Sequence, residues 1–474
     1  MAVVIAAPAS GSGKTLASLA LLAWARRRGL SIQGFKVGPD YLDPQLISAV
    51  SGRPCRNLDI TLCGEGWVHR AFHGYGGGHD LALIEGVMGL FDGVGNSEEG
   101  STAAVARHLQ QPVVLVVDAG GQAASLAALV RGFRDHDPDL SIAGVILNRV
   151  STERHQQLLE DVLGRIGMPV LGCLPRCDAM ALPSRHLGLA PAHELASIEE
   201  RIDRWAALAE QHLRLDALIP LLSAPREADD PLQAIPESTA RPHPVAVASD
   251  AAFHFRYPET GELLERMGMP LLPWSPLANE AIPDDACGLI LPGGFPEQHA
   301  AELASCQTSM DALRRFTATH PVYAECGGML MLGRQLTDLE GHPHAMAGVL
   351  DFSARRGRLQ VGYRTLRPQR DGLLTRRGEI WTGHEFHRWE LEDDPGDRDC
   401  NSLWEIEGWR TKGRAEGWTH PKLHASWVHL HWASCSTICS RWRDGLATAT
   451  PMPANGSSPV SNRNGSNPLR SVGG

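Results

Sequence analysis

The feature that most constrains this chain is a phosphate-binding loop close to its beginning. Residues 8–15 read Pro-Ala-Ser-Gly-Ser-Gly-Lys-Thr, after an apolar run typical of a buried strand and before residues with helical spacing. In this context backbone N–H groups and the first turn of a helix hold phosphates. Gly11 and Gly13 allow the backbone to approach oxygen atoms that a Cβ would obstruct. The chain is therefore expected to start with a nucleotide-binding α/β domain.

The loop also predicts which groups hold the nucleotide. We expect Lys14 to reach the β- and γ-phosphates and Thr15 to offer its hydroxyl to Mg²⁺. Pro8 departs from the usual pattern, which has glycine at this place. ATP and Mg²⁺ are thus the expected co-substrate and metal ion. The expected nucleotide-binding residues are Ser10, Gly11, Ser12, Gly13, Lys14, Thr15 and Asn148, the last of which ends the apolar run GVILN.

Acidic residues follow where open α/β sheets place their ligands. Asp40 and Asp43 lie three apart in the stiff, proline-bounded segment FKVGPDYLDP, and Glu85 ends the apolar run LALIE with Asp92 close behind. We expect these four acids at a synthetase site, with Thr15, Asp40 and Glu85 as the metal ligands. Solvated surface positions are the alternative for each acid taken alone.

Weaker signals accompany this set. Asp118 ends another apolar run, from which a side chain can meet phosphate-bound water. Three basic residues gather locally and would suit a polycarboxylate substrate, although a solvated loop explains them nearly as well. They are Arg176, Arg185 and His186. The net charge of -10 makes nucleic acid an unfavourable partner.

Alternating apolar runs and amphipathic stretches predict two α/β domains. The first reads as a doubly wound parallel sheet, and the second begins a new series of strands. The expected strands are Val3–Ala7, Leu81–Ile84, Val113–Val117, Ala143–Leu147, Val245–Ala248, Gly288–Leu291 and Val322–Ala324. The expected helices of the first domain are Thr15–Arg28, Thr102–Gln110 and Ala123–Asp135. The predicted organisation is a domain at 1–222, a linker at 223–243, a second domain at 244–433 and a disordered tail at 434–474.

The second domain carries a candidate nucleophile. In the segment PVYAECGGML a strand leads into Cys326, followed by two glycines and an apolar helical pattern. A sharp strand-to-helix turn exposes a thiolate and supplies backbone N–H groups to an oxyanion. We expect Cys326 to be the nucleophile, with the oxyanion hole formed at Gly327 and at Gly294 of the LPGGFPE segment.

A base is expected from the late segment ASWVHLHW, where His429 is favoured. Enzymes with a triad of this type carry glutamate two residues after the histidine, and here that position is His431. The simpler interpretation is a Cys-His dyad.

Together these segments resemble the cobyrinic acid a,c-diamide synthase family over nearly all of residues 1–432. The segments that carry the resemblance are APASGSGKT, FKVGPDYLDP, RNLD at Arg56–Asp59, IEGVMGLFDG, LPSRHLGL, DAAFHF at Asp250–Phe255, LPGGFPE, YAECGGM, GHEFH at Gly383–His387 and SWVHLH. The resemblance implies a P-loop domain similar to dethiobiotin synthetase and a class I glutamine amidotransferase-like domain. A short helical finish is expected in the family, whereas this chain has a low-complexity sequence after Trp432.

The resemblance also implies a carbon–nitrogen ligase. ATP would phosphorylate the c- and then the a-acetate carboxylate of cobyrinate or a related corrinoid, and ammonia released from L-glutamine at Cys326 would displace phosphate. Asp40, Asp43, Glu85 and Asp92 match family acids near the nucleotide. The alternatives are a cobyric acid synthase, a nickel-sirohydrochlorin diamide synthase, and a regulatory P-loop ATPase.

The remaining expectations concern the cell compartment. Ten cysteines at scattered spacings, without a CxxC pair, fit a reducing cytoplasm. No segment has the length of a membrane-spanning helix, so no membrane partner is expected. A homodimer is left open.

Overall fold

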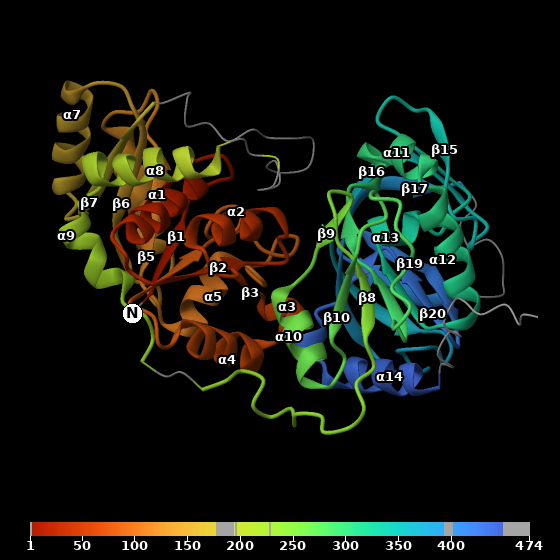
Figure 1. Ribbon diagram of the computed structural model, residues 1–474. Helices are drawn as coiled ribbons and strands as arrows, with labels where there is room; N and C mark the ends of the chain where they lie inside the picture. Colours follow the sequence, from red (N-terminus) through yellow and green to blue (C-terminus); the bar gives the residue numbers. More distant parts are fainter. Residues whose placement is uncertain (1, 177–193, 195–196, 227–228, 393–401, 449–474) are drawn as a thin grey trace, which may run out of the picture.

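The computed structural model describes residues 2–176, 194, 197–226, 229–392 and 402–448. Two α/β bodies lie side by side, and the chain passes between them once, along the bottom of Figure 1. No helix of the described part is long and apolar enough to cross a membrane. Both predicted α/β architectures are present.

The first body is built on a parallel sheet. Its strand order is β3-β2-β4-β1-β5-β6-β7, and every neighbouring pair is parallel. Helices α1, α2 and α8 pack on one face and α4, α5, α6 and α7 on the other, which is the expected doubly wound arrangement. The strands are β1 Val3–Ala6, β2 Ile32–Val37, β3 Arg56–Leu58, β4 Leu81–Glu85, β5 Val113–Asp118, β6 Ile142–Val150 and β7 Val170–Pro175. The helices are α1 Lys14–Arg27, α2 Leu42–Ser51, α3 Ile60–Cys63, α4 Glu65–Gly76, α5 Thr102–Leu109, α6 Ser125–His136, α7 Glu153–Gly164, α8 Ile198–His212 and α9 Leu215–Leu218.

The second body has a mixed sheet. Strands β10-β8-β11-β13-β20 run parallel, which confirms the predicted strands β8, β11 and β13. An antiparallel extension through β19, β18, β16 and β17 was not predicted, because arginines and other polar residues interrupt the apolar residues of β16. The strands are β8 Val245–Ala248, β9 Phe253–Phe255, β10 Leu271–Trp274, β11 Gly288–Leu291, β12 Gly293–Gly294, β13 Val322–Glu325, β14 Gln335–Thr337, β15 Pro343–Ala345, β16 Ser353–Pro368, β17 Trp381–Leu391, β18 Ser402–Gly408, β19 Thr411–His420, β20 Leu423–Ser426 and β21 Val428–His429. The helices are α10 Pro258–Arg266, α11 Ala300–Ser305, α12 Gln307–Thr319, α13 Gly327–Leu330 and α14 Ser436–Ala447.

Helix α14 corrects the expected disordered tail. Disorder from residue 434 is wrong for Ser436–Ala447, which form a helix. Ile438, Cys439, Trp442 and Leu446 recur at helical spacing and are almost completely buried, with Trp442 packed edge-on to Trp432. The burial of this apolar face stabilises the helix despite its polar residues. Residues 449–474 lie outside the described residues.

The two bodies share an apolar and charged interface. Phe255, Tyr257 and Phe295 of the second body cluster with Tyr41, Leu42 and Leu62 of the first. Both ends of the RNLD segment reach across this boundary. Arg56 donates to Glu262 at 2.6 Å, and Asp59 accepts from the Tyr363 hydroxyl at 2.8 Å. The site described below lies at this interface.

Candidate functional site

The loop after β1 is braced from behind by Asn148. The Asn148 amide donates to the Ser12 carbonyl at 2.9 Å. Gly13 has φ 110°, and a Cβ there would lie 2.2 Å from that amide nitrogen, so the contact demands glycine. Asn148 therefore holds the loop, while Ser10 and Gly11 are exposed at its tip.

Lys14 and Thr15 begin α1 and point at neighbouring strand ends. The Lys14 ammonium donates to the Met88 carbonyl, and burial, together with the charge of Lys36, lowers the pKa of Lys14 to about 8. The Thr15 hydroxyl donates to Glu85 at 3.0 Å. Glu85 is fully buried, and its second carboxylate oxygen has no hydrogen-bond partner among the described residues. An unpaired buried oxygen of this kind suits a cation.

Asp40 and Asp43 lie around a buried cation that sequence reasoning missed. The Lys36 ammonium is 3.5 Å from Asp43 and 3.9 Å from Asp40, and it donates to the Gly86 carbonyl at 3.0 Å. Burial, and the charge of Asp43, raise the pKa of Asp40 to about 6. Burial likewise raises the pKa of Asp43 to about 6, although Lys36 opposes the rise. Lys36 lies inside strand β2, which was not predicted, and its sequence gave no signal that its side chain faced these acids.

The other predicted residues of the first body lie apart from this group or serve the loops. The carboxylate of Asp92, which is exposed, accepts from the Gly89 N–H at 2.8 Å and so shapes its own turn. Asp118 pairs with Arg149. Arg176 follows β7, whereas Arg185 and His186 lie outside the described residues.

The strand β13 ends in the predicted sharp turn. Cys326 has φ 48°, a strained value for a residue with a Cβ, and its N–H donates to the Ser426 carbonyl at 2.7 Å. A Cβ on Gly327 would lie 3.0 Å from the Gly294 nitrogen, so the two glycine segments touch beside the sulfur. The backbone nitrogen of Gly294 therefore lies close to Gly327 at this turn.

His429 lies against this turn. Its Nδ1 is 3.2 Å from a carboxylate oxygen of Glu325, and the imidazole also interacts with the side chain of Cys326. Burial by itself would lower the pKa of His429, but the negative charges of Glu325 and Cys326 outweigh it and raise the pKa to about 10. The dyad interpretation had omitted Glu325, because an acid was sought only after the histidine.

His431 faces away from the turn. Its ring packs on Tyr257 and Trp67, with centroid distances of 4.6 and 5.5 Å. Burial lowers the pKa of His431 to about 3, so this imidazole is neutral.

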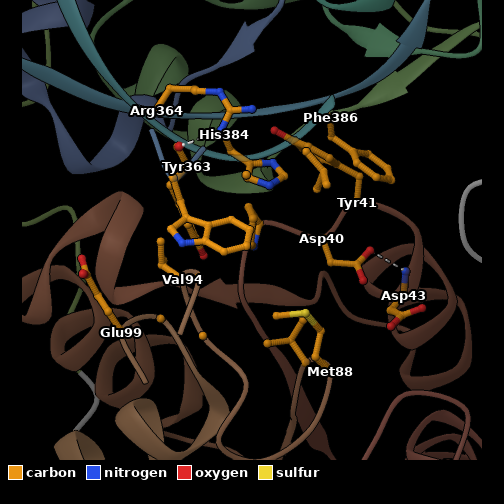
Figure 2. Close-up of a pocket in the computed structure, with 18 of the residues that line it drawn as sticks. Asp40, Tyr41, Asp43, Met88, Val94, Glu99, Tyr363, Arg364, His384 and Phe386 are labelled. Carbon is orange, nitrogen blue, oxygen red and sulfur yellow. Dashed lines mark hydrogen bonds between the residues drawn. The ribbon is translucent and has the colours of Figure 1, made fainter. Parts of the chain in front are cut away.

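A cavity of about 470 Å³ opens between the two bodies. Figure 2 shows Asp40, Asp43 and Met88 below it and Tyr363, His384 and Phe386 above it. Large apolar side chains also line it: Trp409 is 52% exposed and Val361 is 53% exposed. The wall further includes Pro39, Tyr41, Leu42, Val87, Gly93, Val94, Gly95, Glu99, Gly100, Phe255, Gly362 and Arg364. A mostly apolar cavity with a few charged groups in its wall is typical of a small-molecule binding site.

Only a thin layer separates this cavity from Cys326. Phe386 lines the cavity, and its carbonyl oxygen lies 3.6 Å from the sulfur of Cys326. The Tyr41 ring also lines the cavity and packs on the His429 ring at 5.1 Å. The carboxylates and the candidate nucleophile thus flank one region.

A much smaller cavity borders Cys326 on the side of the second body. It is lined by Glu297, Arg388, Gly294 and Trp427, among others. Glu297 is buried, and burial raises its pKa to about 7. The buried Nε of Arg388 has no hydrogen-bond partner among the described residues. A small zwitterion would meet both charges here.

Comparisons with known proteins agree along the chain. Residues 3–189 match the family of CobQ/CobB/MinD/ParA nucleotide binding domains, and residues 244–436 match CobB/CobQ-like glutamine amidotransferase domains. The chain is 43% identical over 453 residues to "Cobyrinate a,c-diamide synthase" of Gloeobacter violaceus, covering 95% of this chain and 98% of that protein. It is 40% identical to the protein of that name from a Synechococcus strain, covering 95% and 100%. It is 39% identical to "Hydrogenobyrinate a,c-diamide synthase" of Streptomyces coelicolor, covering 94% and 97%.

Proposed function

Because this chain belongs to the cobyrinate and hydrogenobyrinate a,c-diamide synthase family, we propose that the cavity between its two bodies is where the macrocycle is amidated. The protein is a glutamine-dependent carbon–nitrogen ligase of cobalamin biosynthesis. We assign the synthetase half to residues 1–222 and the glutaminase half to residues 244–433. The observation that carries the proposal is the position of the cavity, between Asp40 and Asp43 on one side and the neighbours of Cys326 on the other.

At the glutaminase half, Cys326 attacks the carboxamide carbon of glutamine. The C–N bond breaks, a proton from His429 goes to the departing nitrogen, and a thioester is left on the sulfur. Backbone N–H groups of Gly294 and Gly327 stabilise the oxyanion. Water then hydrolyses the thioester, with His429 accepting its proton. Glu297 and Arg388 complement the ammonium and carboxylate of glutamine.

At the synthetase half, a macrocycle carboxylate takes the γ-phosphoryl group of ATP, with release of ADP. A carboxylate is a poor electrophile until one of its oxygens becomes part of a phosphate leaving group. Ammonia then forms the amide bond and phosphate leaves. Loop residues Ser10, Gly11, Ser12, Gly13 and Lys14 hold the nucleotide phosphates, with Asn148 bracing the loop.

The unpaired oxygen of Glu85, beside the Thr15 hydroxyl, supports a site at which these two side chains would hold Mg²⁺. The ion would supply positive charge against the transferred phosphoryl group. Asp40 and Asp43, held at Lys36, contribute ligands or orient the acceptor carboxylate. No group of three or more His, Cys, Asp or Glu side chains in the described ranges forms a metal site by itself.

The macrocycle fits the apolar part of the cavity. Trp409, Val361 and Met88 expose surface that a corrin ring would cover, and Asp40 and Asp43 line the cavity where its acetate carboxylates would reach. The described cysteines are free thiols, which supports a cytoplasmic reaction.

The decisive experiment supplies the purified protein with Mg²⁺-ATP and glutamine and with either cobyrinate or hydrogenobyrinate, and follows ADP and product mass. Two amidations are expected. The Cys326→Ala variant should amidate only with free ammonia. Failure of the intact protein with both nitrogen sources would redirect the search to a nickel-containing macrocycle or to cobyric acid synthase chemistry. ATP hydrolysis indifferent to glutamine and macrocycle would favour a regulatory ATPase.

A further inference from the structure

We propose that Glu325 is the positioning residue of the glutaminase site and completes a Cys326–His429–Glu325 triad from the strand that carries the nucleophile. The inference rests on the roles proposed above for Cys326 and His429. Glu325 takes the place of the glutamate that triad enzymes of this type carry two residues after the histidine, where this chain has His431.

Each carboxylate oxygen of Glu325 lies close to one polar group. One lies 3.2 Å from Nδ1 of His429, and the other accepts from the Tyr323 hydroxyl at 2.6 Å. Glu325 is 7% exposed and ends β13, which pairs in parallel register with β20. A carboxylate fixed by a strand and by a second hydrogen bond has little freedom to leave the imidazole.

Other buried acids near this sheet are engaged elsewhere. Glu385 is 2.6 Å from Arg364 and 2.8 Å from His387. Glu416 accepts from Ser426 at 2.7 Å and from the backbone N–H of Trp427 at 2.9 Å. Glu325 is therefore the acid that faces His429.

The contact determines what each ring nitrogen does. With Nδ1 facing the carboxylate, Nε2 is left for the thiol proton and for the nitrogen that leaves glutamine. The carboxylate stabilises the imidazolium that exists between these two transfers. Removal of Glu325 should therefore lower kcat for glutamine hydrolysis and leave the KM for glutamine nearly unchanged.

A second cavity gives access to Glu325 from behind. This cavity has a volume of about 320 Å³ and is lined by Tyr323, Glu325, Tyr257 and Arg256. It offers a small carboxylate a route to the space that a truncated Glu325 would vacate, next to a cationic side chain. A small carboxylate added to the assay can therefore test whether a carboxylate is needed at this position. If the role of Glu325 were purely structural, the added carboxylate would not restore activity.

The experiment compares glutaminase activity of wild-type protein, Glu325→Ala and Glu325→Gln, with Glu340→Gln as the control at an exposed position. We expect kcat to fall at least about tenfold in both Glu325 variants. Formate should restore a measurable part of the activity in Glu325→Ala and none in Glu325→Gln. The basic limb of the pH profile should move to lower pH in Glu325→Gln, because the imidazolium loses its counter-ion. Amidation driven by free ammonia should be unchanged, which shows that the chain is folded.

Each other outcome is informative. Suppose that Cys326→Ala has no glutaminase activity. The role of Glu325 would then be overturned if the Glu325 variants kept a glutaminase kcat within twofold of wild type and an unchanged basic limb of the pH profile. If Cys326→Ala keeps its glutaminase activity, the proposed nucleophile itself is wrong. If the Glu325 variants lose ammonia-driven amidation, the same measurements are made on Tyr323→Phe instead. This variant removes the hydrogen bond from Tyr323 to the Glu325 carboxylate. An unchanged kcat and pH profile for glutamine hydrolysis would then overturn the proposal.

Discussion

The ring of Tyr41, from the synthetase half, packs on the ring of His429, from the glutaminase half, with their centroids 5.1 Å apart. Tyr41 is the neighbour of Asp40 in the chain and also stacks on Phe255 at 5.1 Å. One side chain thus links the Asp40–Asp43 segment to the proposed glutaminase base, and we expect a shift of this segment on ligand binding to be felt at His429.

This contact predicts that Tyr41→Ala uncouples the two reactions. The wild-type protein should release about one glutamate for each ADP when macrocycle is present, and the variant should release more glutamate than ADP, because the base no longer senses the acceptor segment. Both products are measured in one assay. Tyr41→Phe keeps the ring and should keep the ratio, whereas an unchanged ratio in Tyr41→Ala would refute the coupling role.

The buried Glu85 gives a second prediction. Glu85→Gln removes the charge beside Thr15 and should reduce ATP-dependent amidation by roughly 100-fold or more. Glutaminase activity without ATP should persist, since Glu85 ends a strand of the first body and Cys326 follows a strand of the second. The sharpest measurement is the dependence on Mg²⁺ concentration, which should shift to higher values. An unshifted dependence would exclude Glu85 from the metal site.

Substitution of Trp409 tests whether the macrocycle binds in the large cavity. Trp409 is half exposed at the cavity, so Trp409→Ala should cost little stability. Loss of its stacking surface is expected to raise the KM for the macrocycle about tenfold, with kcat and the KM for glutamine almost unchanged. Ile380→Ala provides the matched control, because Ile380 is 65% exposed and does not line the cavity. Equal KM values in both variants would move the macrocycle elsewhere.

Arg388 tests the glutamine subsite. Its guanidinium borders the small cavity at Cys326, so Arg388→Gln should raise the KM for glutamine and leave ammonia-driven amidation intact. Steady-state kinetics with each nitrogen source separate the two effects. A rise in the KM for ATP instead would show that the variant disturbs the fold.

The acidic pair at Lys36 predicts a pH dependence of stability. The pKa of Asp43 is raised to about 6 in the folded protein, above its usual value near 4. Stability from this group is present at acidic pH and is lost as the pH rises through about 6. Without nucleotide, the melting temperature of wild-type protein relative to Asp43→Asn should therefore rise as the pH falls from 7 to 4. A constant difference would contradict the burial argument.

The residues that could be predicted from the sequence belong to short, continuous motifs. The glycines before Lys14 and the turn after Glu325 each have a short, directional pattern, and their strands and helices lie where predicted. Sequence reasoning missed Lys36, because a buried cation inside a strand leaves no periodic trace. It missed Glu325 as a neighbour of His429, since 104 positions separate them and only β13–β20 pairing brings them together. Helix α14 was hidden by the low-complexity sequence that follows it.

The contacts of the RNLD segment determine how the two bodies unfold. Arg56 forms an ion pair with Glu262, and Asp59 accepts a hydrogen bond from Tyr363. The same interface buries aromatic rings from both bodies. Unfolding of the second body would leave the buried guanidinium of Arg56 and the buried carboxylate of Asp59 without these partners. The halves should therefore melt as one cooperative unit in a calorimeter. A destabilising change in either would deplete both activities together in the cell, so inherited loss of one reaction alone points to the chemistry of its own site.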